Sequence, residues 1–169
     1  MTFHAAGRIG PEGLLIRRAD LSCAADARAV GLLVEAYRLE SQPGLVQRSD
    51  EALGAMVGRL AGMGSALVFL AWLEGEAVGV AVCFAGLSTW TGLPLINIHD
   101  LAVAASQRGR GIGRALLRAV AEYGRASGCC RLTLEVLASN TGAMALYRSE
   151  GYGRGGAETY FLSLELAGG

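Results

Sequence analysis

Apolar residues recur along this chain with two periods, one typical of amphipathic helices and one typical of strands. Ser22 or Asp26 is expected to cap the first helix, and Ser49 or Asp50 the second, because these side chains accept a bond from the first helical turn. The pattern predicts strands at 14–17, 66–73, 77–85, 95–103, 131–137 and 159–166. Two helices lie between the first two of these strands: one breaks at 41–44 and the other ends near 62. A third helix begins at 112 and is ended by Gly128, and a fourth spans 139–150.

This order of elements, β-α-α-β-β-β-α-β-α-β, predicts one α/β domain over residues 1–169 with a mixed sheet. Residues 1–12 contain two glycines and a proline and are expected to form a loose lead-in. Residues 74–76 are expected to form a tight hairpin turn.

The strand at 95–103 changes its period in the middle. Ile96 and Ile98 share a face, but the next apolar pair is Leu101 and Val103, so the alternation slips by one residue. A β-bulge near residues 99–100 would produce this slip and turn backbone groups out of the ladder. The alternative is a strand buried on both faces, where alternation carries no information.

Composition and charge narrow the class of protein. Hydrophobic residues make up 52% of the chain and charged residues 18%, which is typical of a globular protein. The 15 basic and 15 acidic residues balance, so neither nucleic acid nor an anionic membrane is an expected partner. The four cysteines form no CxxC pair and the two histidines have no ligand spacing, so no metal site is expected. With no signal peptide and no membrane span in the sequence, we expect a cytoplasmic protein.

A glycine-rich loop follows the slipped strand and precedes a helix. The loop and its flank hold three arginines and three glycines: Arg108, Gly109, Arg110, Gly111, Gly113 and Arg114. Glycines let a ligand approach the backbone closely, and the start of a helix presents N–H groups and positive charge. This combination suits a phosphate or pyrophosphate, although glycines that only make a turn would give the same composition.

The spacing of these glycines excludes the two common nucleotide loops. The dinucleotide fingerprint needs G-x-G-x-x-G, whereas the glycines here follow G-x-G-x-G. The P-loop needs GK[ST] after four intervening residues, and that sequence is absent. We therefore expect no affinity for ATP or NAD at this loop.

Two blocks of the sequence follow recognisable patterns. Arg108-Gly109-Arg110-Gly111-Ile112-Gly113 has the pattern R-G-x-G-[IV]-[GA], and residues 140–152 have the pattern N-x-x-A-x-x-L-Y-x-x-x-G-[FY]. These patterns resemble the two signatures of the GNAT superfamily of N-acetyltransferases. Both blocks stand in the right order, one helix and one strand apart. The resemblance implies a mixed, mostly antiparallel sheet flanked by helices, with a bulged, splayed strand at the cofactor site.

The same resemblance implies which residues hold acetyl-CoA. Backbone groups of Leu101, Ala102 and Val103 would bond to the pantetheine arm, and the backbone from Gly109 to Arg114 would hold the pyrophosphate. Asn140 would contact the cofactor near the start of its helix, and Tyr147 would lie beside the cofactor sulfur. Asn140 could instead only cap its helix, and Tyr147 could be a core residue.

Acetyl transfer to an amine needs a base for the amine and an acid for the departing thiolate. Tyr147 suits the acid because a phenol is close to a thiol in acidity. Glu135 is one candidate base, since the segment around it resembles the ribosomal-protein N-terminal acetyltransferases. His99 and Asp100 are the other candidates, since residues 96–101 resemble diamine and thialysine acetyltransferases. His99 stands where those enzymes have a glutamate, and this departure is an argument against a polyamine acceptor for this chain.

The sequence therefore predicts an N-acetyltransferase that passes an acetyl group from acetyl-CoA directly to a primary amine in a ternary complex. A small amine, a diamine or an amino-acid-like acceptor is favoured. The alternatives are a protein N-terminal or lysine acetyltransferase and a non-catalytic acyl-CoA sensor. A homodimer is compatible with the sequence, but no feature requires it.

Overall fold

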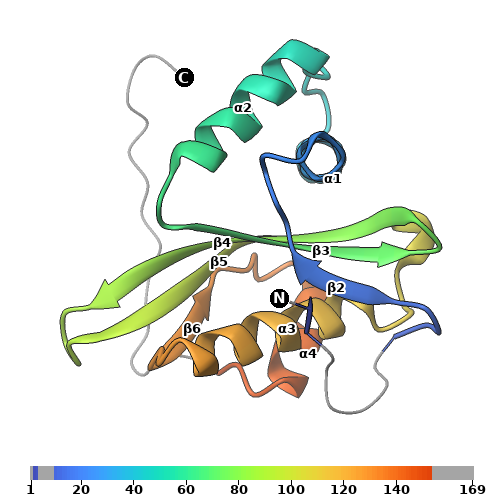
Figure 1. The fold of residues 1–169 in the computed structure, drawn as a ribbon. Helices are drawn as coiled ribbons and strands as arrows, with labels where there is room; N and C mark the ends of the chain where they lie inside the picture. Colours follow the sequence, from blue (N-terminus) through green and yellow to red (C-terminus); the bar gives the residue numbers. More distant parts are fainter. Residues whose placement is uncertain (1, 4–9, 154–169) are drawn as a thin grey trace. The chain divides into compact units, whose positions relative to one another are not determined.

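A six-stranded sheet, in the order β1-β2-β3-β4-β5-β6, organises the residues up to Glu135 (Figure 1). The computed structural model describes residues 2–3 and 10–153. Strands β1 to β5 run antiparallel to their neighbours, and β5 and β6 run parallel. This confirms the mixed, mostly antiparallel sheet. The elements of this part are β1 (Thr2–Phe3), β2 (Leu15–Arg18), α1 (Ala24–Ser41), α2 (Asp50–Gly62), β3 (Ala66–Leu73), β4 (Glu76–Ser88), β5 (Leu93–Val103), η1 (Ala105–Gln107), α3 (Ile112–Ala126) and β6 (Arg131–Leu134).

Helices α1 and α2 cover one face of this sheet, here called the α1/α2 face (Figure 1). Their apolar sides pack on alternating residues of β3, β4 and β5, as expected when a helix stripe meets one face of a pleated sheet. The buried cluster consists of Ala29, Val30, Val57, Leu60, Val68, Leu70, Val80, Val82 and Ala102.

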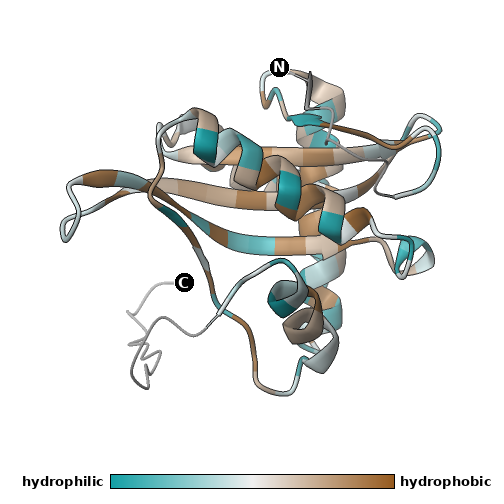
Figure 2. Ribbon diagram, turned by 90° about the horizontal axis from the view of Figure 1, so that it is seen from below, coloured by the Kyte–Doolittle hydropathy of each residue, from teal (hydrophilic) through white to brown (hydrophobic). Residues whose placement is uncertain are grey.

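Helix α3 covers the opposite face, here called the α3 face (Figure 2). Its buried side includes Leu116 and Val120, and its outward side is hydrophilic in Figure 2. The helix approaches β4 closely at Gly79, where an added Cβ would lie 3.1 Å from Leu116 Cδ1. Lower on the helix, Tyr123 packs edge-on against Phe69 of β3, with ring centroids 5.7 Å apart.

Two predicted elements are confirmed at their bounds, and two others end at different residues. The strand at 66–73 is β3, and the turn at Glu74 and Gly75 has both residues at positive φ, which suits a two-residue hairpin. The second helix begins after Ser49, whose hydroxyl accepts the Ala52 N–H at 3.2 Å. Strand β4 runs three residues beyond the predicted end, and β6 stops three residues before its predicted end at 137.

The predicted caps of α1 are wrong. The helix begins after Cys23, while the Ser22 hydroxyl bonds to the Asp20 carboxylate. Asp26 lies inside the first turn, 1% exposed, and binds Arg17 of β2 at 2.5 and 2.6 Å. This bond with Arg17 lowers the pKa of the Asp26 carboxyl. A buried carboxylate needs such a partner, so Asp26 attaches α1 to the sheet instead of capping the helix.

The two ends of the chain differ from the prediction or lie outside the description. Within the lead-in, Thr2 and Phe3 form a short strand that pairs with β2. The strand predicted at 159–166 lies outside the described residues. The described residues 136–153 belong to a second unit, in which α4 (Thr141–Ser149) is shorter than the helix predicted at 139–150. No helix in the described part of the chain is long and apolar enough to span a membrane.

Candidate functional site

The predicted bulge in β5 is confirmed. Val82 of β4 pairs with Asp100, and the next residue, Cys83, pairs with Ile98. His99 is therefore the extra residue, and the register of the ladder shifts at this point. Before the bulge, β5 places Ile98 on the α3 face. After it, Ala102 lies in the core of the α1/α2 face. The bulge explains the slipped apolar period of this strand.

Strand β5 continues beyond the end of its parallel neighbour. The pairs with β6 run from Leu95 to Ile98, whereas β5 continues to Val103. The Ala104 N–H donates to the Val78 carbonyl at 2.9 Å, which fixes the alternation of bonds along the β4–β5 ladder. In this alternation, the N–H and C=O of Ala102 point toward β4.

The same alternation directs the backbone groups of Leu101 and Val103 to the side that β6 has left. The Val103 carbonyl accepts the Arg108 Nε–H at 3.0 Å. Of the three residues predicted to bind the pantetheine arm, Leu101 and Val103 thus lie in the favourable orientation. The role of all three stays a prediction.

The glycine-rich loop enters α3 through two residues in the left-handed region. Gly109 has a φ of 76°, and Gly111, the residue before the helix, has a φ of 83°. The first turn of the helix closes with the Ala115 N–H donating to the Gly111 carbonyl at 3.0 Å. The N–H groups ahead of Ala115 thus have no helical acceptor and point out of the positive end of the helix. An added Cβ at Gly109 would meet no atom within 4 Å. This loop fits a pyrophosphate.

The arginines of the loop have partners that the sequence did not reveal. Arg108 binds Glu40, near the end of α1, through two bonds of 2.5 and 2.6 Å, which lowers the pKa of the Glu40 carboxyl. Arg110 donates to Gln107 one turn earlier, and Arg114 is half-buried in the first turn of α3. The Arg108 guanidinium therefore joins the loop to α1, and the backbone offers the more direct contacts for a phosphate.

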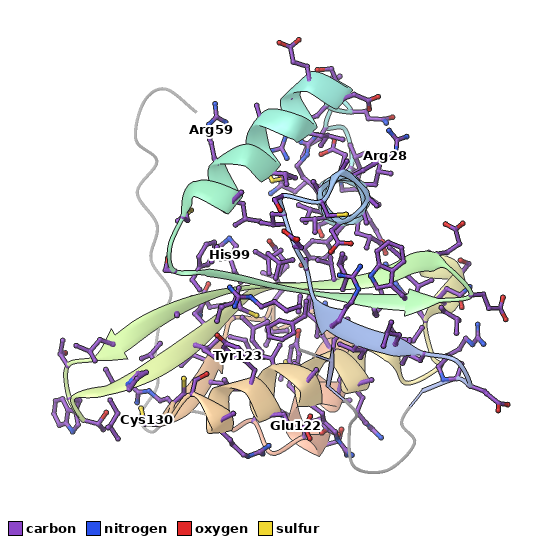
Figure 3. The ribbon with its side chains drawn as sticks, viewed as in Figure 1. Arg28, Arg59, His99, Glu122, Tyr123 and Cys130 are labelled. Carbon is purple, nitrogen blue, oxygen red and sulfur yellow. The ribbon has the colours of Figure 1, made fainter. Side chains whose placement is uncertain are left out.

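His99 and Asp100 lie together on the α1/α2 face at the bulge. Figure 3 shows His99 on the side of the sheet that carries α1 and α2, and Tyr123 on the opposite side. The imidazole is exposed and packs edge-on against Phe84, with ring centroids 5.6 Å apart. Asp100 is half-buried, and this burial raises the pKa of its carboxyl, although the neighbouring His99 lowers it. A carboxyl with a raised pKa is suited to take a proton near neutral pH.

The third candidate base, Glu135, is exposed and is the first residue after β6. Thr133, two residues earlier, lies on the α1/α2 face, where its hydroxyl accepts a bond from Asn97 Nδ2 at 3.1 Å. The ladder ends at Leu134, so no strand pairing fixes the direction of Glu135. The structure thus brings His99 and Asp100 together and leaves Glu135 at the end of the neighbouring strand.

Asn140 and Tyr147 belong to the second unit. Asn140 precedes α4, and its Oδ1 accepts the Ala143 N–H at 3.0 Å. The capping interpretation of Asn140 is therefore confirmed, and a contact with the cofactor stays a prediction. Tyr147 is half-buried and its ring packs against Tyr152, with centroids 5.9 Å apart. The Tyr152 N–H donates to the Tyr147 carbonyl at 3.0 Å.

Sequence reasoning missed three residues near the site. Glu40, the partner of Arg108, gives no signal because it is one of several polar residues near the end of α1. Asn97 and Thr133 occupy polar positions in alternating strands, and that alternation was the available signal. Their mutual bond depends on the parallel register of β5 and β6, which the sequence alone does not supply.

Comparison with known proteins identifies the family. The model of the Acetyltransferase (GNAT) family matches residues 33–152, which is most of the chain. The chain belongs to the GNAT family. It is 39% identical over 74 residues to the thialysine N-epsilon-acetyltransferase of Bos taurus, covering 44% of this chain and 43% of that protein. It is 39% identical over 80 residues to the N-alpha-acetyltransferase RimI of Mycobacterium tuberculosis, covering 46% of this chain and 49% of that protein.

The alignments with these curated relatives span less than half of the relatives' length. A solved structure covers more. An aminoglycoside acetyltransferase from an uncultured soil metagenomic sample, in complex with trehalose, superposes with a TM-score of 0.73 over 90% of this chain and 97% of its own. Its 22% sequence identity shows a shared fold. The GNAT fold implied by the two sequence blocks is therefore confirmed, whereas the acceptor differs among the relatives.

Proposed function

We propose that this GNAT protein is one N-acetyltransferase domain that transfers the acetyl group of acetyl-CoA directly to a primary amine. The observation that carries the proposal is the bulge at His99, next to a strand edge and a helix start that both present backbone groups. Acetyl-CoA supplies the activated acyl group. The Gly109–Arg114 backbone would hold its pyrophosphate, and the backbone of Leu101 and Val103 would orient its pantetheine arm.

The residues at the bulge supply the proton chemistry of this proposal. Asp100, or His99 beside it, accepts a proton from the amine nitrogen, because both lie on one face and burial raises the pKa of the Asp100 carboxyl. A backbone N–H at the bulge stabilises the negative charge that develops on the carbonyl oxygen. The four cysteines are free, which supports a reducing compartment, and we place the protein in the cytoplasm.

Thiol release from acetyl-CoA in the presence of an amine panel tests the proposal. The panel contains diamines, amino acids, an aminoglycoside and a peptide with a free N-terminus. We expect amine-dependent thiol release, with a small amine or amino acid ahead of the peptide. Binding of acetyl-CoA without turnover on any amine would instead support a non-catalytic acyl-CoA sensor.

Tyr147 is the proposed acid that protonates the thiolate sulfur. Tyr147→Phe keeps the ring that packs against Tyr152 and removes only the hydroxyl. We expect kcat to fall by about 10²-fold, with the dissociation constant of acetyl-CoA nearly unchanged. Steady-state kinetics with calorimetry of acetyl-CoA binding measure both quantities. Unchanged turnover would remove Tyr147 from the chemistry.

A further inference from the structure

Part of the α1/α2 face lies beyond the helices that cover the rest of it. Along β4, Val80 and Val82 are buried in the core, Phe84 is half-buried and Gly86 is exposed. Figure 1 shows the same change, because the β4–β5 hairpin extends past α1 and α2. The exposed part, here called the open face, begins at the His99 bulge and ends near the hairpin.

Polar side chains of β5 and β6 line this open face. Asn97 donates from Nδ2 to the Thr133 hydroxyl at 3.1 Å, which leaves Asn97 Oδ1 as an acceptor beside the bulge. Arg131 lies two residues before Thr133 on the same face of β6, and its Nη2 contacts the Ser88 hydroxyl at 3.5 Å. An acceptor on this surface would therefore meet one row of polar groups from Asp100 to Arg131.

The two ends of this row carry opposite chemistry. Asp100 and His99 form the end that can accept protons or bind an ammonium group. Arg131 forms the other end, and no carboxylate of the described residues lies within ion-pair distance of it. Arg131 pairs with Leu95, which lies about four strand steps from Asp100, so with the spacing between strands the Cα atoms of Arg131 and Asp100 are about 14 Å apart. The Arg131 side chain contacts Ser88, which pairs with Leu93 on the hairpin side of Arg131. Turned from Ser88 toward the bulge, the exposed side chain would bring its guanidinium within the span of an extended amino acid bound at His99 and Asp100.

We propose that the acceptor is an amine that also carries a carboxylate, with its reacting amine at His99 and Asp100 and its carboxylate at Arg131. This inference rests on the proposed acetyltransferase function and specifies its substrate class. Arginine is suited to carboxylates because its planar N–H groups can form two parallel bonds. Arg131 also repels a second ammonium group, so it selects against diamines of the same length. Asn97 Oδ1 lies between the two ends and can accept an N–H of the acceptor.

Three related acceptors test this proposal: L-lysine, L-lysine amide, which has a neutral amide in place of the carboxylate, and cadaverine, which lacks the carboxylate. For the wild type we expect a KM for lysine about tenfold below the KM for cadaverine, with lysine amide close to cadaverine. Arg131→Gln should raise the KM for lysine about tenfold and leave cadaverine unchanged. Arg131→Glu should reverse the order, since a carboxylate there attracts the second ammonium group.

Arg125→Gln is the matched control, because Arg125 is an exposed arginine near the end of α3, on the other side of the sheet. It should leave all three KM values unchanged. Calorimetric titration of lysine into wild type and Arg131→Gln measures the same loss of affinity without turnover, and thermal unfolding checks that the variants are folded. A lysine-to-cadaverine KM ratio that is the same in wild type, Arg131→Gln and Arg131→Glu would overturn the proposal.

The outcomes also separate this inference from the function on which it rests. Turnover of cadaverine at least as good as that of lysine, with no effect of Arg131, would retain the acetyltransferase and remove the carboxylate site. Thiol release on none of the amines, with acetyl-CoA still bound, would overturn both. Turnover of lysine that falls in Arg131→Gln would support both.

Discussion

The two sides of strand β5 differ in the atoms that they offer a ligand. The edge at Leu101 and Val103, with the glycine loop, offers backbone groups and the start of α3. The open face offers side chains, from Asp100 and His99 to Arg131. Backbone groups recognise what all acyl-CoA molecules share, whereas side chains can vary without changing the fold. This difference explains how relatives of one fold can be named for thialysine, N-terminal and aminoglycoside acceptors.

Loss of the proposed base, Asp100, should give the largest effect on turnover, and it tests the role of the side chains on the open face. Asp100→Asn keeps the shape of the side chain and removes proton acceptance, so we expect kcat to fall by about 10³-fold, with acetyl-CoA affinity unchanged. The rate should rise with pH as Asp100 loses its proton, at a pH above the ordinary range of aspartate because burial raises its pKa. His99→Ala removes the charge that lowers this pKa, so it should move the acidic limb to higher pH. A pH–rate profile measures both.

Glu135→Gln is the matched comparison for the base. It removes a carboxylate from the end of β6 without touching the bulge. We expect a change in kcat of less than about threefold, as for an exposed charge outside the chemistry. Loss of the acidic limb in Glu135→Gln, with the limb retained in Asp100→Asn, would assign the base to Glu135.

Helix α1, which covers the neighbouring part of the α1/α2 face, depends on a buried ion cluster, and loss of this cluster should give the next largest effect. Glu35 in α1 is 3% exposed and accepts bonds from Arg38 at 2.8 and 2.9 Å and from the Arg48 N–H at 2.8 Å. The cluster, led by the Arg38 bond, lowers the pKa of Glu35 to about 2. Glu35→Gln should lower the free energy of unfolding by about 3 kcal/mol at pH 7, because it leaves the arginines without their anion.

The pH dependence of this loss follows from the lowered pKa. The contribution of Glu35 is complete above its ordinary pKa near 4.5 and disappears as the pH falls toward 2. Urea unfolding at pH 7 and pH 2.5 should therefore show a smaller gap between wild type and Glu35→Gln at the acidic pH. Arg28→Gln, an exposed change on the same helix, serves as control and should be near neutral. An equal gap at both pH values would contradict the assigned charge.

Backbone features that depend on local sequence could be predicted, whereas side-chain contacts between distant segments could not. The strands predicted at 14–17, 66–73, 77–85, 95–103 and 131–137, the bulge, the Ser49 cap and the glycine loop follow from local patterns of apolar residues and glycines, and these are present in the described residues. The caps of α1 were wrong because Asp26 is held by Arg17, a contact between segments that local spacing cannot reveal. The bond between Asn97 and Thr133 and the place of Arg131 could not be predicted for the same reason, because they depend on the parallel pairing of β5 and β6.

A change in the backbone of the glycine-rich loop should have a smaller effect, on the affinity for acetyl-CoA. Gly109→Ala adds a Cβ at a φ of 76° where no protein atom lies within 4 Å, so the change strains the backbone by about 1 kcal/mol and obstructs only a ligand. We expect the dissociation constant of acetyl-CoA to rise about tenfold in calorimetry. Arg110→Gln removes a charge from the next residue and should weaken binding less. A larger loss for Arg110→Gln would mean that side-chain charge dominates the loop.

The smallest expected effect concerns stability at the bulge. Because burial raises the pKa of Asp100, the folded state favours the protonated carboxyl, and the ionised form destabilises the fold. This penalty is absent at a pH below the unfolded pKa of aspartate and present above the folded pKa. Asp100→Asn should therefore raise the free energy of unfolding at pH 7 by at most about 1 kcal/mol, and leave it unchanged at pH 3. Urea unfolding at both pH values checks this. A variant that is inactive yet more stable at pH 7 would mean that the open face retains an unfavourable charge for its chemistry, whereas equal destabilisation at both pH values would mean that Asp100 supports the bulge instead.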